Sequence, residues 1–202
     1  MSASQPARER WNERYSRAGF RPLAAHPAEW LVEHRALLEE VRDGARRPRA
    51  LDVACGDGSD ARLLAEIGFE VVALDLSDVA VEAVRSAAGE RGLRIDARVS
   101  NLERDPLPRG GHDVVICMSY LQRDLFAALA DALRPGGLLL YETFARAHVD
   151  ELGRPFNPDY VLGRNELLGA FARLHVRHYR EGIVSRRGES RGVASLVAQR
   201  LA

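Results

Sequence analysis

A loop of small and acidic residues has the composition of a ligand-binding turn. It reads Leu51-Asp52-Val53-Ala54-Cys55-Gly56-Asp57-Gly58-Ser59. Gly56 and Gly58 let a strand turn sharply into a helix and leave room for a ligand to approach the backbone. The spacing also satisfies the dinucleotide pattern G-x-G-x-x-[GA], so the glycines alone do not separate a nicotinamide cofactor from other adenosine-bearing ligands.

The acidic side chains of this loop indicate which ligand fits. Asp57 and Asp60 place two carboxylates beside the start of the following helix, and Asp52 adds a third. A pyrophosphate needs that positive helix end unopposed, whereas S-adenosylmethionine has no phosphate and carries a sulfonium and an ammonium group. The loop therefore favours S-adenosylmethionine, with the alternative that Asp57 and Asp60 only cap the helix.

Asp75 is a second acidic position, at the end of the next apolar run. A carboxylate there can accept hydrogen bonds from both ribose hydroxyls, which disfavours a phosphate at the 2′ position. The alternative is that Asp75 caps the next helix, but Ser77 and Asp78 can already do so. We therefore expect Asp75 to bind the ribose.

Apolar runs alternate with helical patterns and would position these residues. We expect strands at 50–54, 70–74, 93–99, 113–118 and 137–142, and helices at 60–67, 78–88 and 124–133. Gly68 is the stop signal of the first helix and Ser77 the N-cap of the second. The pattern predicts an α/β fold with a doubly wound, mostly parallel, seven-stranded sheet of the Rossmann-like type.

The two ends of the chain complete a single domain over residues 1–202. Residues 1–45 form a predicted helical cap, with helices at 8–18 and 28–41. At the other end we expect a helix at 166–171 and an antiparallel hairpin of strands 174–179 and 193–199 around a turn from Arg186 through Arg187 to Ser190. His175 and His178 would point to opposite faces of a strand, so they would not bind one metal ion, and we expect no metal site.

The composition excludes several classes of chemistry. The 29 basic residues are all arginines, so P-loop, pyridoxal phosphate and Schiff-base chemistry are excluded. The two cysteines, Cys55 and Cys117, are too few for a disulfide framework and fit a reducing cytoplasm. The balanced charge does not indicate a polyanion, and no run approaches the roughly 20 apolar residues of a membrane span. We expect a cytoplasmic protein without a nucleic-acid or membrane partner.

Three motifs in this order resemble the class I S-adenosylmethionine-dependent methyltransferases over residues 50–142. Leu51 to Gly58 looks like the family's first motif, Ala73-Leu74-Asp75-Leu76-Ser77 like its second, and Leu133-Arg134-Pro135-Gly136-Gly137 like the turn before its fifth strand. The resemblance implies that Gly56 and Gly58 admit the methionine portion, that Asp52 or its neighbours meet the ammonium group, and that Asp75 holds the ribose. Ala54 replaces a glycine common in the first motif, which narrows the loop slightly.

The same resemblance extends the expected cofactor site beyond the loop. Asn101 stands where many relatives carry a carboxylate, and its carbonyl can accept a hydrogen bond from the adenine amino group, while the Leu102 N–H can donate to a ring nitrogen. Cys117-Met118-Ser119-Tyr120 takes the position beneath the adenosine and methionine. The expected cofactor-binding residues are Trp11, Tyr15, Asp52, Ala54, Cys55, Gly56, Asp57, Gly58, Asp75, Leu76, Ser77, Asn101, Leu102, Cys117, Met118 and Tyr120.

A narrower likeness lies outside these motifs. The opening Trp11-Asn12-Glu13-Arg14-Tyr15 and the segments 141–144 and 153–158 are similar to small bacterial methyltransferases of the tellurite-resistance-like group. This implies that Trp11 and Tyr15 close over the cofactor, where an aromatic face favours the sulfonium. The alternative is plain packing of two rings at helical spacing.

These observations predict an enzyme that transfers a methyl group from S-adenosylmethionine to a small-molecule acceptor by in-line displacement, leaving S-adenosylhomocysteine. Positioning supplies most of such catalysis, so we assign no catalytic residue. Tyr120, Glu142 and His148 are the first groups to test because they follow strands that end at the ligand side of the sheet. Nucleic-acid amino methyltransferases carry an Asn-Pro-Pro-Tyr-like motif after the fourth strand, where this chain has Cys117-Met118-Ser119-Tyr120. The later Asn157-Pro158-Asp159-Tyr160 resembles that motif only superficially.

Two other functions stay open: an NAD(P)-dependent oxidoreductase, and a non-catalytic adenosine-binding module. The acceptor is not identified, and both a monomer and a homodimer are compatible with the sequence. If the first and fourth strands are neighbours, Cys55 and Cys117 lie close together, which would admit a soft metalloid acceptor as a hypothesis.

Overall fold

The computed structural model describes residues 4–154, 156–186 and 188–201. The chain forms two compact units, Met1–Pro108 and Arg109–Ala202. Each unit is described by itself below. Pro155 and Arg187, which belong to the predicted loop and turn, lie outside the described residues.

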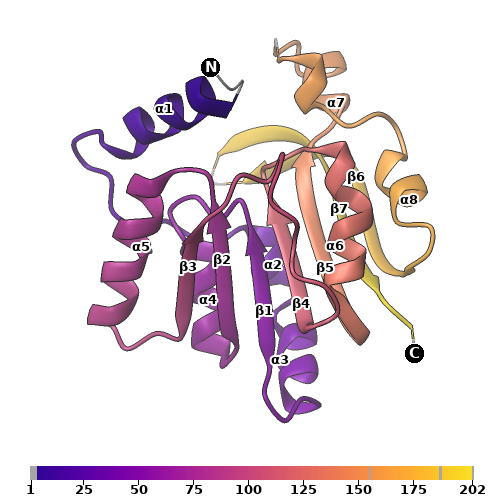
Figure 1. The fold of residues 1–202 in the computed structure, drawn as a ribbon. Helices are drawn as coiled ribbons and strands as arrows, with labels where there is room; N and C mark the ends of the chain where they lie inside the picture. The colour runs from indigo at the N-terminus through magenta and orange to yellow at the C-terminus, as the bar shows by residue number, and fades with distance from the viewer. Residues whose placement is uncertain (1–3, 155, 187, 202) are drawn as a thin grey trace. The chain divides into compact units, whose positions relative to one another are not determined.

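The first unit alternates helices and strands after three N-terminal helices (Figure 1). Its elements are α1 (Ser4–Tyr15), α2 (Glu29–Glu33), α3 (Arg35–Asp43), β1 (Arg49–Val53), α4 (Ser59–Ile67), β2 (Glu70–Asp75), α5 (Asp78–Glu90) and β3 (Ile95–Val99).

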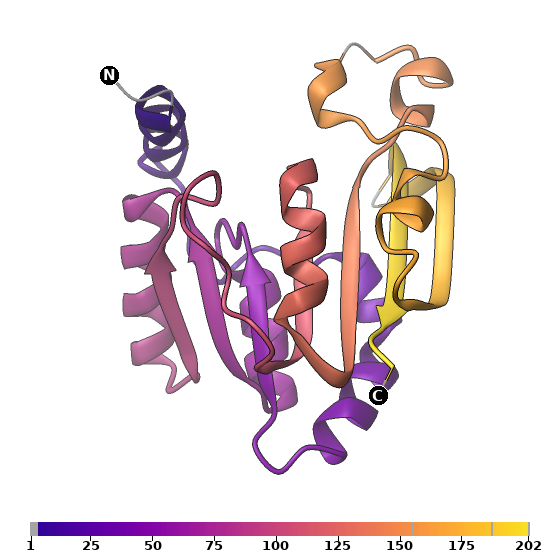
Figure 2. The same ribbon diagram turned by 45° about the vertical axis from the view of Figure 1, so that its right-hand side comes forward.

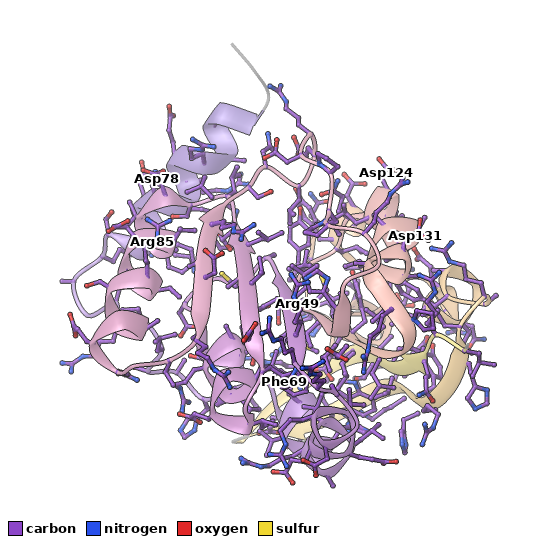
Figure 3. All side chains as sticks on the ribbon, turned by 60° about the horizontal axis from the view of Figure 1, so that its bottom comes forward. Arg49, Phe69, Asp78, Arg85, Asp124 and Asp131 are labelled. Atoms are coloured by element: carbon purple, nitrogen blue, oxygen red, sulfur yellow. The ribbon has the colours of Figure 1, made fainter. Side chains whose placement is uncertain are left out.

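The strands of this unit pair in parallel, with β2 between β1 and β3. Val53 lies opposite Leu74, and Asp75 lies opposite Val99. The carboxyl ends of the three strands therefore meet at one edge, and the acidic loop residues follow that edge. Helices α4 and α5 are the crossover connections and pack against the strands. In the side-chain view, Arg49 begins β1, and the fully buried Phe69 precedes β2 (Figure 3).

The signals that predicted the helix boundaries act as expected. Gly68 ends α4 with a φ of 122°, and its N–H donates to the Leu64 carbonyl over 3.1 Å. Ser77 precedes α5 in an extended conformation, and its hydroxyl accepts the Ala80 N–H over 3.1 Å. Both predictions are confirmed.

The N-terminal region differs from the two predicted helices. The helix expected at 8–18 spans Ser4–Tyr15, and the one expected at 28–41 is broken at His34 into α2 and α3. His34 leaves the helical conformation with φ −105° and ψ 18°. Its ring Nδ1 lies 2.8 Å from the Trp30 carbonyl and its ring packs on Trp30 at 4.1 Å, contacts that a periodicity argument does not include.

The second unit contains two parallel strands followed by an antiparallel hairpin (Figure 2). Its elements are β4 (His112–Met118), the 3₁₀ helix η1 (Arg123–Leu125), α6 (Phe126–Ala132), β5 (Leu133–Phe144), α7 (Ala147–Asp150), the 3₁₀ helix η2 (Pro158–Tyr160), α8 (Glu166–Ala170), β6 (His175–Arg186) and β7 (Glu189–Gln199). β4 is parallel to β5, and β7 runs antiparallel between β5 and β6. Phe126, Tyr141 and Phe171 form an aromatic core, with ring centroids 5.3–6.0 Å apart.

The C-terminal hairpin is longer than predicted. β6 continues to Arg186, which pairs with Glu189 at the start of β7. The expected placement of His175 and His178 on opposite faces is wrong. A register shift between Val176 and His178 pairs His175 with Gln199 and His178 with Val197, which stand two residues apart and so on one face.

The predicted fold class is confirmed: the seven described strands are mostly parallel, in a Rossmann-like arrangement with an antiparallel C-terminal hairpin. The prediction that residues 1–202 act as one domain stays a prediction. Among the described helices, none combines the length and the apolar character that a membrane crossing requires.

Candidate functional site

The loop after β1 adopts the left-handed backbone conformation at three positions. Ala54, Gly56 and Gly58 have φ values of 60°, 55° and 76°. A residue with a Cβ atom pays roughly 1–2 kcal/mol in this region, whereas glycine does not. Ala54 therefore occupies a strained position, which is the physical reason a glycine is favourable there.

Asp75 links this loop to the next one. Its carboxylate accepts hydrogen bonds from the Gly56 N–H and the Ser77 N–H, each over 2.9 Å. Burial raises the pKa of Asp75, and the N–H groups of Ser77, Gly56 and Leu76 oppose that shift. A carboxylate oxygen has two acceptor positions, so Asp75 can hold the loop and also accept from a ligand hydroxyl.

Asp52 is the most deeply buried acid of the site. It is 1% exposed, and its Oδ2 has no hydrogen-bond partner among the described residues. Burial, followed by the charges of Asp60, Asp75 and Asp57, raises the pKa of Asp52 well above its ordinary value. An unpartnered carboxylate oxygen surrounded by other acids fits a cationic ligand and opposes a phosphate.

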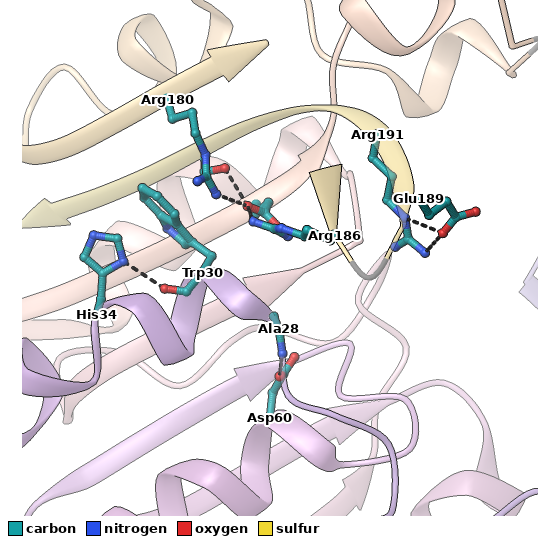
Figure 4. A network of polar contacts seen from close by, with 10 residues as sticks. Ala28, Trp30, His34, Asp60, Arg180, Arg186, Glu189 and Arg191 are labelled. Atoms are coloured by element: carbon teal, nitrogen blue, oxygen red, sulfur yellow. Dashed lines mark hydrogen bonds and ion pairs between the residues drawn. The ribbon is translucent and has the colours of Figure 1, made fainter. Parts of the chain in front are cut away.

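The two acids at the start of α4 also have structural roles. Asp57 accepts hydrogen bonds from the N–H and the hydroxyl of Ser59, over 3.2 and 2.9 Å. Asp60 accepts the Ala28 N–H over 2.7 Å (Figure 4). The structure therefore supports the helix-start interpretation of Asp57, and Asp60 fastens the N-terminal region to α4. Their negative charges still act on Asp52.

Helix α1 reaches the glycine loop through Tyr15. A Cβ atom on Gly56 would lie 2.8 Å from the Tyr15 hydroxyl, so this side chain covers the loop at that point. Trp11 and Tyr15 stack with centroids 6.0 Å apart, and burial raises the pKa of Tyr15 together with the charge of Asp75. The first unit thus brings Tyr15, Gly56 and Asp75 together.

Asn12 fastens α1 and was not among the expected site residues. Its amide oxygen accepts the Ser77 hydroxyl over 2.7 Å, and its amide nitrogen donates to Asp78 over 2.8 Å. Its sequence signals were its place in the Trp11–Tyr15 opening and its position one helical turn before Tyr15.

Gly58 serves packing in this structure. A Cβ atom there would lie 2.8 Å from Leu23 Cδ2 and 2.9 Å from both methyl groups of Val84. Leu23 is fully buried, and its N–H donates to the Asp57 carbonyl over 2.8 Å. The role in ligand approach that the resemblance implies for Gly58 stays a prediction.

The loop after β3 contains a carboxylate that the motif comparison overlooked. Asp105 accepts the Asn101 N–H over 2.7 Å and lies 3.4 Å from the Ser100 hydroxyl, while the Asn101 side chain accepts the Glu103 N–H over 3.2 Å. The Ser100 N–H donates to the Asp75 carbonyl over 2.8 Å, which connects this loop to β2, and Leu102 is buried. The expected adenine contacts of Asn101 and Leu102 stay predictions.

The expected site residues of the second unit lie at the end of β4. Cys117 and Met118 are buried, and Ser119 has a φ of 57° and turns the chain toward Tyr120. The buried Tyr141 hydroxyl donates to the Tyr120 carbonyl over 2.6 Å. Cys55 and Cys117 belong to different units, so their proximity stays a prediction; burial raises the pKa of the Cys55 thiol well above its ordinary value.

Glu142 is held in an ion-pair cluster. Arg186 contacts both of its carboxylate oxygens, Arg180 lies 3.4 Å from it, and the Ser195 hydroxyl donates to it over 2.5 Å. Figure 4 shows the guanidinium groups of Arg180 and Arg186 in this network. These partners give Glu142 a structural role.

Tyr120 and His148 also have defined partners. The Tyr120 hydroxyl donates to Gln122 over 2.8 Å, and His148 Nδ1 accepts the Gly192 N–H over 3.2 Å. His148 is thereby fixed in orientation beside the end of β5.

Comparison with known proteins agrees with this fold. Residues 50–137 match the family model of the methyltransferase domain. The ubiquinone biosynthesis O-methyltransferase of Shewanella halifaxensis is 32% identical over 116 residues, which cover 54% of this chain and 49% of that protein. The enzyme of the same name from Bordetella avium is 28% identical, covering 71% of this chain and 60% of its own. The chain spans about half the length of the curated relatives it matches, up to 60% for the Bordetella protein.

Solved structures share the fold at low sequence identity. TehB from Haemophilus influenzae superposes with a TM-score of 0.67 at 15% identity, covering 82% of this chain and 62% of TehB. A geranyl diphosphate methyltransferase solved with S-adenosylmethionine has a TM-score of 0.63 at 19% identity, covering 84% and 85% of the two chains. The glycine loop and the acid that ends β2 both lie within the matched residues 50–137, so this part of the chain is similar to the methyltransferase domain.

Proposed function

We propose that this chain is an enzyme that methylates a small-molecule acceptor with S-adenosylmethionine. The observation that carries the proposal is the arrangement of Asp52 and Asp75 around the glycine loop. Asp52 offers a buried carboxylate oxygen without a partner in the described residues, and Asp75 offers acceptor positions beside Gly56. Negative groups at this loop favour a cation and disfavour the diphosphate of a nicotinamide cofactor.

The residues of this chain would bind and orient the cofactor. Asp75 would accept from the ribose hydroxyls, Asp52 would compensate the ammonium group, and Tyr15 would cover the loop. When bound, S-adenosylmethionine would supply a methyl group from its sulfonium, which would leave as neutral S-adenosylhomocysteine while the acceptor's proton is released to bulk solvent. The protein's task is then to exclude water and to align the acceptor, which accounts for roughly 7–11 kcal/mol in well-oriented reactions.

An oxygen atom is the proposed acceptor. Relatives with 28–32% identity are named ubiquinone biosynthesis O-methyltransferases, and their matches cover 54% and 71% of this chain. A tellurite-resistance-like role is the second candidate, supported by the WNERY opening and by the shared fold with TehB. A cytoplasmic location, one domain over residues 1–202, the absence of a nucleic-acid partner and a monomeric or homodimeric state belong to the same proposal and rest on the sequence.

Calorimetric titration tests this function. We expect S-adenosylmethionine and S-adenosylhomocysteine to bind and NADH not to bind. Asp75→Ala should lose most of the affinity while a circular dichroism spectrum shows that the fold persists. NADH binding in place of S-adenosylmethionine would support the oxidoreductase alternative. Cofactor binding without methyl transfer to any phenol, thiol, amine or metalloid oxyanion would support the non-catalytic alternative.

A further inference from the structure

Three aromatic rings cluster beside the carboxyl end of β5. Phe144 ends β5, His148 lies in α7, and Phe156 follows in the next loop. Their ring centroids are 4.7 Å (Phe144 to His148), 4.6 Å (Phe144 to Phe156) and 5.6 Å (His148 to Phe156) apart. We call these three residues the His148 cluster. Ligands of α/β folds bind at the carboxyl ends of the parallel strands, which is where the cluster lies.

The backbone of β7 fixes the orientation of the histidine ring. The Gly192 N–H donates to His148 Nδ1 over 3.2 Å. A Cβ atom on Gly192 would lie 2.0 Å from the His148 backbone nitrogen, so α7 packs directly on β7. Since Nδ1 accepts, the proton of the neutral ring is on Nε2. Within the described part of the chain, no hydrogen bond uses Nε2.

The groups around the cluster carry a surplus of positive charge. Arg191 lies 2.6 Å and Arg154 3.9 Å from the carboxylate of Glu189, so two guanidinium groups share one acid. Both arginines are about half exposed, and Arg154 also donates to the Ser190 carbonyl over 3.0 Å. Burial and these two arginines lower the pKa of His148, opposed by Glu189, so the ring is neutral near pH 7.

We propose that the His148 cluster binds the methyl acceptor and that the acceptor is an aromatic acid. Its ring would pack against Phe144 and Phe156, one of its oxygens would accept from His148 Nε2–H, and its anionic group would lie toward Arg154 and Arg191. This inference rests on the proposed function and names its substrate class. The competing interpretation is that His148 only fastens α7 to β7, a role that needs Nδ1 and neither Nε2 nor the arginines.

Two substitutions separate the two ring nitrogens. His148→Asn keeps an acceptor near the Nδ1 position for the Gly192 N–H and removes the Nε2 donor, whereas His148→Gln keeps a donor near the Nε2 position and loses the Gly192 bond. The probes are 3,4-dihydroxybenzoate and its uncharged analogue catechol, titrated calorimetrically into protein saturated with S-adenosylhomocysteine. We expect His148→Asn to weaken both probes about tenfold, the scale of a lost hydrogen bond, and His148→Gln to weaken them less.

The arginines test the acid group. Arg154→Gln and Arg191→Gln should each weaken 3,4-dihydroxybenzoate several-fold and leave catechol unchanged. Arg146→Gln is the matched control, because Arg146 flanks the same helix, pairs with Asp150 and lies outside the cluster. It should change neither probe.

The outcomes distinguish this inference from the proposed function. The inference is overturned if His148→Asn binds both probes as tightly as wild type and only His148→Gln loses stability. His148 would then serve only to hold α7 to β7. Failure of S-adenosylhomocysteine to bind would instead contradict the proposed function, and the probes would still be titrated alone. If His148→Asn unfolds, nitrogen NMR of wild-type His148 decides: a shift of Nε2–H with 3,4-dihydroxybenzoate supports the inference, and an unchanged signal at saturation overturns it.

Discussion

The buried carboxylate of Asp52 opposes folding of the ligand-free protein near neutral pH. Burial and neighbouring acids raise its pKa above the ordinary 3.8, so the folded state binds the proton more tightly than the unfolded chain. The stability it contributes is therefore fully present below pH 3.8 and is lost as the pH rises toward the folded pKa.

Asp52→Asn should therefore stabilise the ligand-free protein at pH 7. Since the raised pKa of Asp52 makes its ionised form costly in the folded state, we expect a gain in the free energy of unfolding and a flatter pH dependence. Urea unfolding between about pH 5 and 8 measures both effects. The same variant should bind S-adenosylmethionine more weakly. A variant less stable than wild type at pH 7 would contradict the electrostatic argument.

Gly58 tests whether packing or backbone strain demands a glycine. Gly58→Ala would place a methyl group against Leu23 and Val84 in addition to imposing a φ of 76° on alanine. We expect it to lower the free energy of unfolding by about 2–4 kcal/mol, the sum of strain and overpacking. Gly92→Ala is the control, because Gly92 has a φ of 63° and open space around it, and should cost about 1 kcal/mol. Equal losses would show that packing is not the reason.

Local sequence signals were enough to predict the structural roles of some of these residues but not of others. Gly68 and Ser77 act within one helical turn of their own positions, so sequence reasoning could place them. Asp60 and Glu142 form hydrogen bonds with groups 32 and 44 residues away in the sequence, and no local sequence pattern predicts such partners.

Among the elements, α1 is held to the loop after β2 by the Asn12 side chain. Asn12→Ala removes its bonds to Ser77 and Asp78, each of which is shorter than 3 Å. The two hydrogen bonds together contribute about 1–2 kcal/mol. Without them, amide hydrogen exchange in residues 4–15 should accelerate roughly tenfold. Glu13→Ala, an exposed neighbour on the same helix, should leave the exchange unchanged. Mass spectrometry of the peptides from α1 measures the difference, and equal rates in both variants would show that other contacts hold the helix.

The C-terminal hairpin is joined to β5 by the ion pair between the partly exposed Arg186 and the buried Glu142. Arg186→Met should lower stability by about 3–5 kcal/mol because it leaves the carboxylate with weaker compensation. The double variant with Glu142→Leu should recover part of that loss, because the carboxylate is then removed with its partner, while Arg180 and Ser195 lose an acceptor. A double-mutant cycle by urea unfolding measures the coupling, and strictly additive losses would contradict it.

Element order could be predicted from the sequence more fully than element length. Alternating apolar runs and helical periods gave the parallel strands, but β6 extends seven residues beyond its predicted end at Tyr179. Its pattern of half-buried residues lacks the apolar run that marks β4, and the register shift near Arg177 changes which side chains share a face. Such shifts depend on the partner strand.

For the whole molecule, each ligand should slow amide hydrogen exchange in the segments whose residues bind it. S-adenosylmethionine at about 100 times its Kd should stabilise the protein by about 2.7 kcal/mol and slow amide exchange in segments 52–58 and 75–78, where Asp52, Gly56 and Asp75 lie. 3,4-Dihydroxybenzoate should slow exchange in 144–148 and 189–192, the segments around the His148 cluster. Slowed exchange in segment 117–120 with S-adenosylmethionine would support the expected cofactor contacts of Cys117, Met118 and Tyr120. Protection of 52–58 by NADH alone would contradict the reasoning from charge, because a diphosphate would then bind among the four acids that should repel it.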